Sequence, residues 1–254
     1  MSTSKNLYFR KKISMKKFVL INSFFFFGFL LNAQPPAYHD LMILFTEGNY
    51  KKLIKQAEKY TLKDDTKDDA LAYYWLGKGL YKISFQNNKD EEYENAYKEG
   101  IMFLGKCKKK DKTGEVFEKE IDFFHEVKSS IMEQIMNEIT LKQYKKTIEW
   151  CKRIYLIFPD DVATKYMDAA CKYQLNDQTG AAIIWNECQK PLEKIQSIDQ
   201  LNDIEKEFFC YAITKNLGFM KEFKQQNMAK LVGQKANMWF SDNTEFQQAF
   251  ENVK

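Results

Sequence analysis

The chain has 254 residues, with 39 Lys and Arg against 35 Asp and Glu, 44% hydrophobic residues and five cysteines. Strand-rich sandwiches and barrels need turn residues roughly every 8 to 12 positions, and ten glycines and four prolines are too few for that. The composition therefore excludes a turn-rich β fold and favours long helices.

Residues 1–33 have the order of a secretory signal peptide. Six cations and no acid come first, and the apolar run Phe18–Leu31 follows. This run is shorter than the roughly 20 residues that span a membrane, and the small residue Ala33 stands where a signal peptidase cuts. We expect cleavage after Ala33, with translation from Met1 or Met15. An uncleaved N-terminal anchor is the alternative.

Export changes the charge of the mature chain. The signal peptide holds six of the 39 cations and none of the acids, so 33 cations and 35 acids remain. A nearly neutral body does not attract a phosphate backbone, so we predict no nucleic-acid partner. The lysine cluster Lys106–Lys112 is interpreted as a solvated loop. The residue directly after the cleavage site is Gln34 and not a cysteine, so a lipid anchor of the bacterial lipoprotein type is not expected. We expect a periplasmic or outer-membrane-associated protein without a stable membrane span.

Two helices joined by a tight turn are predicted after a short lead at residues 34–37. The first covers Tyr38–Thr46, and Gly48-Asn49-Tyr50 makes the turn into the second. Another pair is predicted between Ala70 and Gly100. Its first helix carries Tyr73, Leu76, Gly77 and Leu80, and its second carries Tyr93 and Ala96. A mid-helix glycine costs up to about 1 kcal/mol relative to alanine, so we expect close helix contact at Gly77.

A long helix is predicted over residues 115–140, with a bend at Ser129-Ser130. The clearest helical pattern follows it and ends at Pro159, because proline cannot continue a helix. Its apolar face comprises Tyr144, Ile148, Cys151, Ile154, Tyr155 and Phe158. Two more helices are predicted at 163–174 and 179–189, with small residues that allow close approach.

The C-terminal part, residues 199–254, is predicted to hold three helices. The first two, at 199–217 and 219–233, are separated near Gly218. The last, at 242–252, is expected to cap the fold.

Three of these segments resemble the tetratricopeptide repeat (TPR), a helix–turn–helix unit of 34 residues. Tyr144, Thr147, Ile154 and Pro159 match positions of the second repeat helix; Tyr73, Leu76 and Gly77 match the first. No unit has the full consensus, since Leu53 and Thr147 replace the small residue. The resemblance implies an all-α array of TPR-like α-hairpins, an α-solenoid, over residues 38–198. The helices of residues 199–254 would pack on it and cap it. A different α-hairpin array is the alternative.

In TPR-like arrays the first helices line a concave groove that takes a peptide or helix of a partner. The resemblance implies groove residues on two units, and Tyr74 and Tyr81 are the expected anchors. The first set is Leu71, Tyr74, Lys78 and Tyr81, and the second is Met167, Cys171 and Gln174. The alternative is that both tyrosines pack on neighbouring helices.

No catalytic, metal-binding or cofactor-binding motif occurs in the sequence. The two histidines, His39 and His125, lack the close His or Cys neighbours of a zinc site, and P-loop and Gly-x-Ser-x-Gly motifs are missing. The cysteines are interpreted as small buried residues, with a disulfide between Cys151 and Cys171 as the alternative. They are Cys107, Cys151, Cys171, Cys188 and Cys210.

We therefore expect a non-enzymatic adaptor or scaffold of a Gram-negative cell envelope, without cofactors, that binds another protein or peptide, as in an envelope or secretion complex. One alternative is an envelope enzyme, such as a cell-wall hydrolase, with a scattered carboxylate site. Paired carboxylates of raised pKa in a deep cleft would favour it. The other is a structural spacer, which would expose no aromatic groove.

Overall fold

The computed structural model describes residues 38–87 and 90–254, so the predicted signal peptide and lead lie outside the described residues. Within these ranges, twelve α-helices and one 3₁₀ helix are present and no strand is found. The prediction of an all-α chain is confirmed. Residues Asp40–Lys254 form one compact unit.

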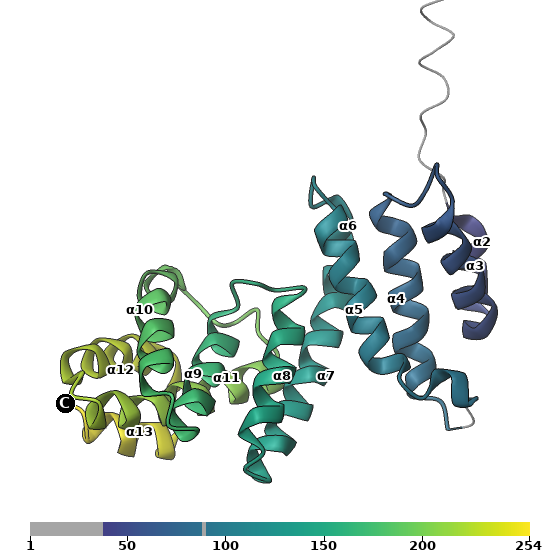
Figure 1. Ribbon diagram of the computed structural model, residues 1–254. Helices are drawn as coiled ribbons and strands as arrows, with labels where there is room; N and C mark the ends of the chain where they lie inside the picture. Colours follow the sequence, from purple (N-terminus) through teal and green to yellow (C-terminus); the bar gives the residue numbers. More distant parts are fainter. Residues whose placement is uncertain (1–37, 88–89) are drawn as a thin grey trace, which may run out of the picture. The chain divides into compact units, whose positions relative to one another are not determined.

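The helices follow one another with short connections (Figure 1). The first group is α2 (His39–Thr46), α3 (Tyr50–Leu62), α4 (Ala70–Ser84), η1 (Glu91–Tyr93) and α5 (Ala96–Lys110). The second group is α6 (Glu115–Lys119), α7 (Ile121–Thr140), α8 (Tyr144–Tyr155), α9 (Val162–Gln174) and α10 (Gln178–Lys194). The C-terminal group is α11 (Asp203–Glu222), α12 (Gln226–Phe240) and α13 (Thr244–Glu251).

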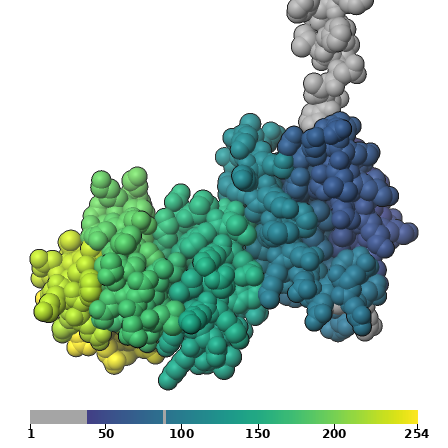
Figure 2. Space-filling model, viewed as in Figure 1, coloured from purple at the N-terminus to yellow at the C-terminus, as the bar shows by residue number. Residues whose placement is uncertain are grey.

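Helices that are consecutive in the chain pack side by side. Such pairs are α3 with α4, α4 with α5, α7 with α8, α8 with α9, and α9 with α10. In the space-filling view the colours accordingly follow one another in chain order (Figure 2). Helix α11 departs from this order, because it packs on α7 and α9 as well as on α12 and α13.

Short polar side chains determine where many of the helices begin. Each of these N-cap residues accepts a hydrogen bond from a backbone N–H of the first turn, which would otherwise lack a partner. They are Asn49, Asp69, Asp161, Asp177, Asn202 and Asn243. The turn between α2 and α3 uses Gly48 at φ 68°, a left-handed conformation that glycine adopts at low cost.

The helix predicted up to Pro159 is α8, and its buried face has the expected phase. Thr147, Cys151 and Ile154 have no exposed surface, whereas Ile148 is only half-buried. Lysine side chains at positions 145 and 152 point to solvent. All five cysteines are buried free thiols, so the structure has no Cys151–Cys171 disulfide and agrees with the interpretation of the cysteines as small core residues.

Three predicted details of the helices are wrong. Helix α7 runs without interruption through Ser129 and Ser130, and the long helical segment is interrupted at Glu120 instead, between α6 and α7. Tyr93 belongs to η1 and precedes α5. Helix α11 continues through Gly218, where the neighbouring Leu217 is fully buried and supplies packing that offsets the low helix propensity of glycine.

Close approach of α4 and α5 explains the glycine in α4, as predicted. A Cβ atom on Gly77 would lie 2.8 Å from the Leu104 side chain and 3.0 Å from the Gly100 carbonyl oxygen. One on Gly100 would lie 2.9 Å from the Tyr81 backbone nitrogen. The two helices are thus in backbone contact at these glycines.

Alanine at Gly100 and at Gly218 should have opposite effects on stability. At Gly100 the added methyl group meets backbone atoms that cannot move aside, and we expect a loss of about 1–3 kcal/mol. Nothing lies within 4 Å of a Cβ on Gly218, so higher helix propensity should stabilise by about 0.5–1 kcal/mol. Urea unfolding of both variants measures the difference. A stabilised Gly100→Ala variant would show that α4 and α5 are not this close.

Candidate functional site

The predicted groove face of α4 is covered by the chain's own helices. Tyr74 is fully buried; its hydroxyl donates to Glu120, and its ring lies 5.8 Å from Phe123 and 6.0 Å from Phe124. Tyr81 is also buried, 5.5 Å from Phe123. The packing alternative therefore describes both tyrosines, and neither is an exposed anchor. The reason is that Glu120, between α6 and α7, and the phenylalanines of the first turn of α7 fit this face.

Lys78, also predicted in the groove, is enclosed by aromatic rings. Its side chain is 13% exposed, and its Nζ atom lies 3.5 Å from Glu120. Burial lowers the pKa of Lys78, although the Glu120 carboxylate opposes that shift. The rings within 4.7–5.4 Å of Nζ are those of Phe45, Tyr74, Trp75 and Phe123. Cation–π attraction and the ion pair thus hold this ammonium group inside the fold.

The second predicted set is divided between core and surface. Met167 and Cys171 are fully buried, where α11 packs on α9. Gln174 is exposed, and Leu71 of the first set is half-buried. None of the seven predicted groove residues lines the cleft that lies between the α4–α5 and α7–α8 helix pairs. A binding role for the accessible ones stays a prediction.

A cleft of about 370 Å³ lies between the α4–α5 pair and the α7–α8 pair. We call it the aromatic cleft, after the rings of Phe85, Tyr97 and Trp150 that line it. The remaining lining residues are Ser84, Glu94, Asn95, Lys98, Ser130, Glu133 and Gln134. The cleft thus combines three aromatic side chains with a polar rim.

The rings of the cleft form a continuous series that starts in the core. Phe85 is 60% exposed, and its ring lies edge-on, 5.0 Å from the buried Tyr81 and 5.8 Å from Tyr97. Tyr97 in turn lies 5.8 Å from Trp150, and its hydroxyl is 2.9 Å from Ser130 Oγ. Burial raises the pKa of Tyr97 to about 12. These contacts hold the aromatic surface in place, and a pre-organised surface of this kind lowers the entropy cost of binding any ligand that fits it.

The charges around the cleft are mixed. Glu94 and Glu133 line it together with Lys98. Lys98 Nζ lies 5.9 Å from the Trp150 ring, and the Arg153 guanidinium carbon lies 4.7 Å from that ring. Such an arrangement offers apolar contact and hydrogen bonds to a polypeptide segment.

A paired-carboxylate site of raised pKa is not seen in the cleft. Burial raises the pKa of the Asp168 carboxyl, but Asp168 does not line the aromatic cleft. Its neighbour is the Tyr155 hydroxyl, 3.4 Å away, rather than a second carboxylate.

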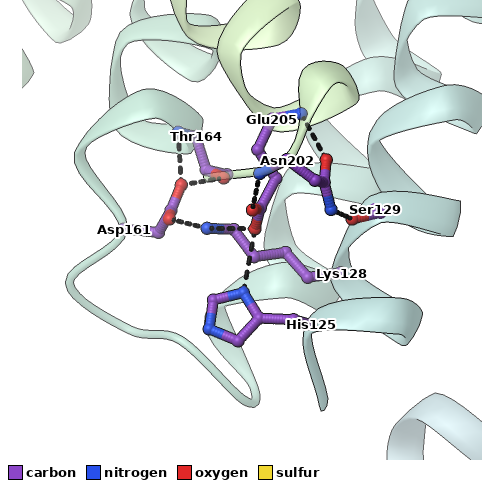
Figure 3. A network of polar contacts seen from close by, with 7 residues as sticks. All are labelled: His125, Lys128, Ser129, Asp161, Thr164, Asn202 and Glu205. Atoms are coloured by element: carbon purple, nitrogen blue, oxygen red, sulfur yellow. Dashed lines mark hydrogen bonds and ion pairs between the residues drawn. The ribbon is translucent and has the colours of Figure 1, made fainter. Parts of the chain in front are cut away.

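A buried ion-pair network joins α7 to the N-terminal ends of α9 and α11 (Figure 3). Lys128 Nζ lies 2.5 Å from Asp161 Oδ2 and 3.2 Å from Glu205 Oε1. The Lys128 and Glu205 side chains are 5% and 2% exposed. His125 Nδ1 lies 3.0 Å from Glu205 Oε1, and the Asn202 N–H donates to Glu205 Oε2.

Burial and pairing act in opposite directions on the charges of this network. Burial by itself lowers the pKa of Lys128, but Asp161 and Glu205 outweigh it and the net pKa is raised. Burial by itself raises the pKa of Glu205, but His125, Lys128 and the Asn202 amide together lower it. The charged forms of Lys128 and Glu205 are therefore favoured, and the network connects α7, α9 and α11 through buried ion pairs.

Sequence reasoning missed this network, although two local signals were present. Lys128 stands on the apolar face of α7, between Phe124 and Ile131, where a solvated lysine is not expected. Asn202 and Glu205 form a capping box, with the Asn-x-x-Glu spacing typical of a helix start. A cavity of about 360 Å³, with many apolar lining residues, adjoins the network.

No metal centre or membrane-spanning helix is seen in the described part of the chain. Over residues 38–87 and 90–254, no three His, Cys, Asp or Glu side chains are grouped closely enough to hold a metal ion. Nor does any helix of these ranges combine the length and apolar character that crossing a bilayer requires.

The comparisons with known proteins found no counterpart: no family model, no curated protein and no solved structure matches this chain.

Proposed function

We propose that this chain is a non-enzymatic adaptor of a Gram-negative cell envelope that binds a segment of a partner protein in the aromatic cleft. It is built, in this proposal, as a TPR-like array of α-hairpins and exported by cleavage after Ala33. The aromatic cleft is the observation that carries the proposal. Successive packing of consecutive helices supports the array, and the basic–apolar–small order of residues 1–33 supports export.

The group of three accessible aromatic rings distinguishes this cleft from ordinary surface. Tryptophan and tyrosine are enriched among the residues that dominate binding energy at protein interfaces. Here Trp150 and Tyr97 are half-buried, and Phe85 is 60% exposed at the mouth. A volume of about 370 Å³ accommodates a few side chains of a partner segment, and the rim residues Glu94 and Lys98 offer polar contacts.

The same observation weighs against a structural spacer, which would expose no aromatic groove. The observation that would favour a cell-wall enzyme, a group of carboxylates with raised pKa, is not found at this cleft. The adaptor is therefore the function that the geometry favours.

Photo-crosslinking in the native envelope tests the proposal. Benzoylphenylalanine at position 85 should give one defined adduct with another protein, because the Phe85 side chain lies at the cleft mouth. Trp150→Ala in the same chain should reduce adduct formation at least tenfold, as expected for a central interface residue worth about 2 kcal/mol or more.

The control places the same probe at Leu141, which is 67% exposed and does not line the cleft. Adducts that are equal at positions 85 and 141, or unchanged by Trp150→Ala, would contradict partner binding at the aromatic cleft.

A further inference from the structure

A second surface, on the first helical hairpin, combines exposed apolar side chains with exposed lysines. Between α2 and α3 there is an open hollow of about 530 Å³, on the dark blue and purple helices of Figure 1. We call it the basic hairpin face. Its lining residues are Asp40, Ile43, Leu44, Lys52, Lys55, Gln56 and Lys59.

The apolar part of this face is not part of the core. Ile43 is 56% exposed, and the adjacent Met42 is 45% exposed. The hairpin is held together by other residues, since Leu41 and Leu53 are fully buried. Two neighbouring large apolar side chains on α2 are thus left partly in solvent, although burial of apolar surface is favourable.

The charged part of the face is a row of unpaired cations. Lys52, Lys55 and Lys59 are exposed, and none of them forms an ion pair within residues 38–87 and 90–254. Lys51 of the same helix, in contrast, pairs with Asp90 at 2.7 Å.

The lone acid of the face is already engaged. Asp40 Oδ2 accepts hydrogen bonds from the Tyr60 hydroxyl at 3.0 Å and from Gln56 Nε2 at 3.3 Å. Both donors are neutral, so Asp40 can offset only one of the lysine charges, and the lining carries three cations against one acid. An occupant of this face must supply negative charge.

We propose that the basic hairpin face docks an acidic amphipathic helix of another protein. Positions 52, 55 and 59 of α3 are three and four residues apart and span about 10 Å along the helix at 1.5 Å per residue. Acidic residues with the same spacing lie on one side of a partner helix. The hollow between α2 and α3 receives an apolar side chain of that helix against Ile43 and Leu44, in the manner of helix-in-groove recognition. This site is independent of the aromatic cleft.

Two other occupants are disfavoured by charge and shape. The chain's own residues 1–33 carry six cations and no acid, so the lysine row repels them. An anionic bilayer would meet the lysines, but a hollow suits a protruding side chain better than a flat surface, and the lining includes no Trp or Phe of the kind that anchors proteins in membrane interfaces.

The test uses residues 34–254, which contain the whole compact unit, and a labelled synthetic helix as the probe. The probe is an alanine-based peptide with leucines along one stripe and glutamates at i, i+3 and i+7 beside it. Its partner peptide carries lysines in place of the glutamates. Fluorescence anisotropy at low salt should show saturable binding of the acidic peptide only.

Variants locate the binding surface. The triple exchange Lys52→Glu, Lys55→Glu and Lys59→Glu should weaken binding at least tenfold, and Ile43→Ser should weaken it several-fold. A matched control reverses Lys145, Lys190 and Lys230, which are exposed and unpaired in the described ranges, and so makes the same change in net charge. The control should change binding less than twofold.

Three results would overturn the proposal. The first is the absence of binding by the acidic peptide, or equal binding of the lysine peptide. The second is an equal loss in the two triple variants, which would indicate a general charge effect. The third is binding to phosphatidylglycerol-containing vesicles, lost in the Lys52, Lys55 and Lys59 variant, without binding of the peptide; that pattern would identify a membrane surface as the occupant.

Discussion

Exchange of Lys128 for alanine is expected to destabilise the protein by about 3–5 kcal/mol, because it leaves two largely buried carboxylates without their shared cation. Asp161 and Glu205 lie 2.5 and 3.2 Å from the Lys128 ammonium group, and the Glu205 side chain is only 2% exposed. Urea unfolding followed by circular dichroism measures the loss.

Two controls separate the buried charge from other effects of mutation. Lys145→Ala removes an exposed lysine and should change stability by less than about 0.5 kcal/mol. Neutralising the network as a whole, with Lys128→Met, Asp161→Asn and Glu205→Gln together, should cost less than Lys128→Ala alone, because no unpaired charge then remains. Equal losses for Lys128→Ala and Lys145→Ala would mean that Lys128 is not buried among these carboxylates.

The same network makes stability depend on pH in a predictable direction. The folded-state pKa of Glu205 is lowered, so its contribution is present above the unfolded-state value of about 4.3 and is lost as the pH falls through the folded-state pKa. The folded-state pKa of Lys128 is raised, so its contribution is present below about 10.4 and is lost as the pH rises through the folded-state pKa. Urea unfolding between neutral and acidic pH should therefore show a smaller acid-induced loss in Glu205→Gln than in the unmodified protein.

Exchange of Trp185 for alanine should also cost about 3–5 kcal/mol, by removal of a large core side chain. Trp185 of α10 is fully buried, and its indole N–H donates to Asn216 Oδ1 of α11. Asn216 Nδ2 donates to the carbonyl oxygens of Tyr166 and Ala212, at 2.7 Å each. The variant therefore leaves a cavity and an unsatisfied Asn216 oxygen at the junction of α9, α10 and α11.

Milder changes resolve these two contributions. Trp185→Phe keeps much of the ring but removes the N–H donor, and it should cost about 1–3 kcal/mol for the unsatisfied acceptor. A double-mutant cycle of Trp185→Phe with Asn216→Ala should give a coupling energy of about 0.5–3 kcal/mol. Ile183→Ala, on the same helix but at a side chain that is 55% exposed, is the control and should change stability little. Equal losses at positions 183 and 185 would contradict the phase of α10.

Local signals in the sequence account for most of the helices. Apolar spacing predicted α8 and α9, because the side chains that recur every three to four residues must lie on one face of a helix. Asp161 and Asp177 supply side-chain acceptors at the starts of α9 and α10. Helix boundaries failed where burial overrode propensity, as at Gly218, because the packing of α11 on α7 and α9 offsets the cost of one glycine.

The expected exposure of Tyr74 and Tyr81 was wrong for a different reason, since both side chains are buried. The TPR resemblance assigned Tyr74 and Tyr81 to an open face, and no local pattern shows that Glu120 and α7 lie against that face. Nothing in the local sequence distinguishes Phe123 and Glu120 from other residues of a helical segment. Only the structure shows that both contact Tyr74 of α4. The aromatic cleft was likewise missed, because its three rings come from the end of α4, from α5 and from α8.

The amino-acid sequence alone determined that this protein is helical, where most helices lie and which side of α8 is buried, since these properties depend on residues within one or two turns of each other. Tertiary structure decided which faces remain open and which charges are buried. The two ends of the network, Lys128 and Glu205, are 77 positions apart in the chain, and the three cleft rings come from three different segments. Such contacts depend on how α7 and α11 pack against helices that are distant in the sequence. The apolar periodicity of a single helix shows which face is buried but not which helix covers it.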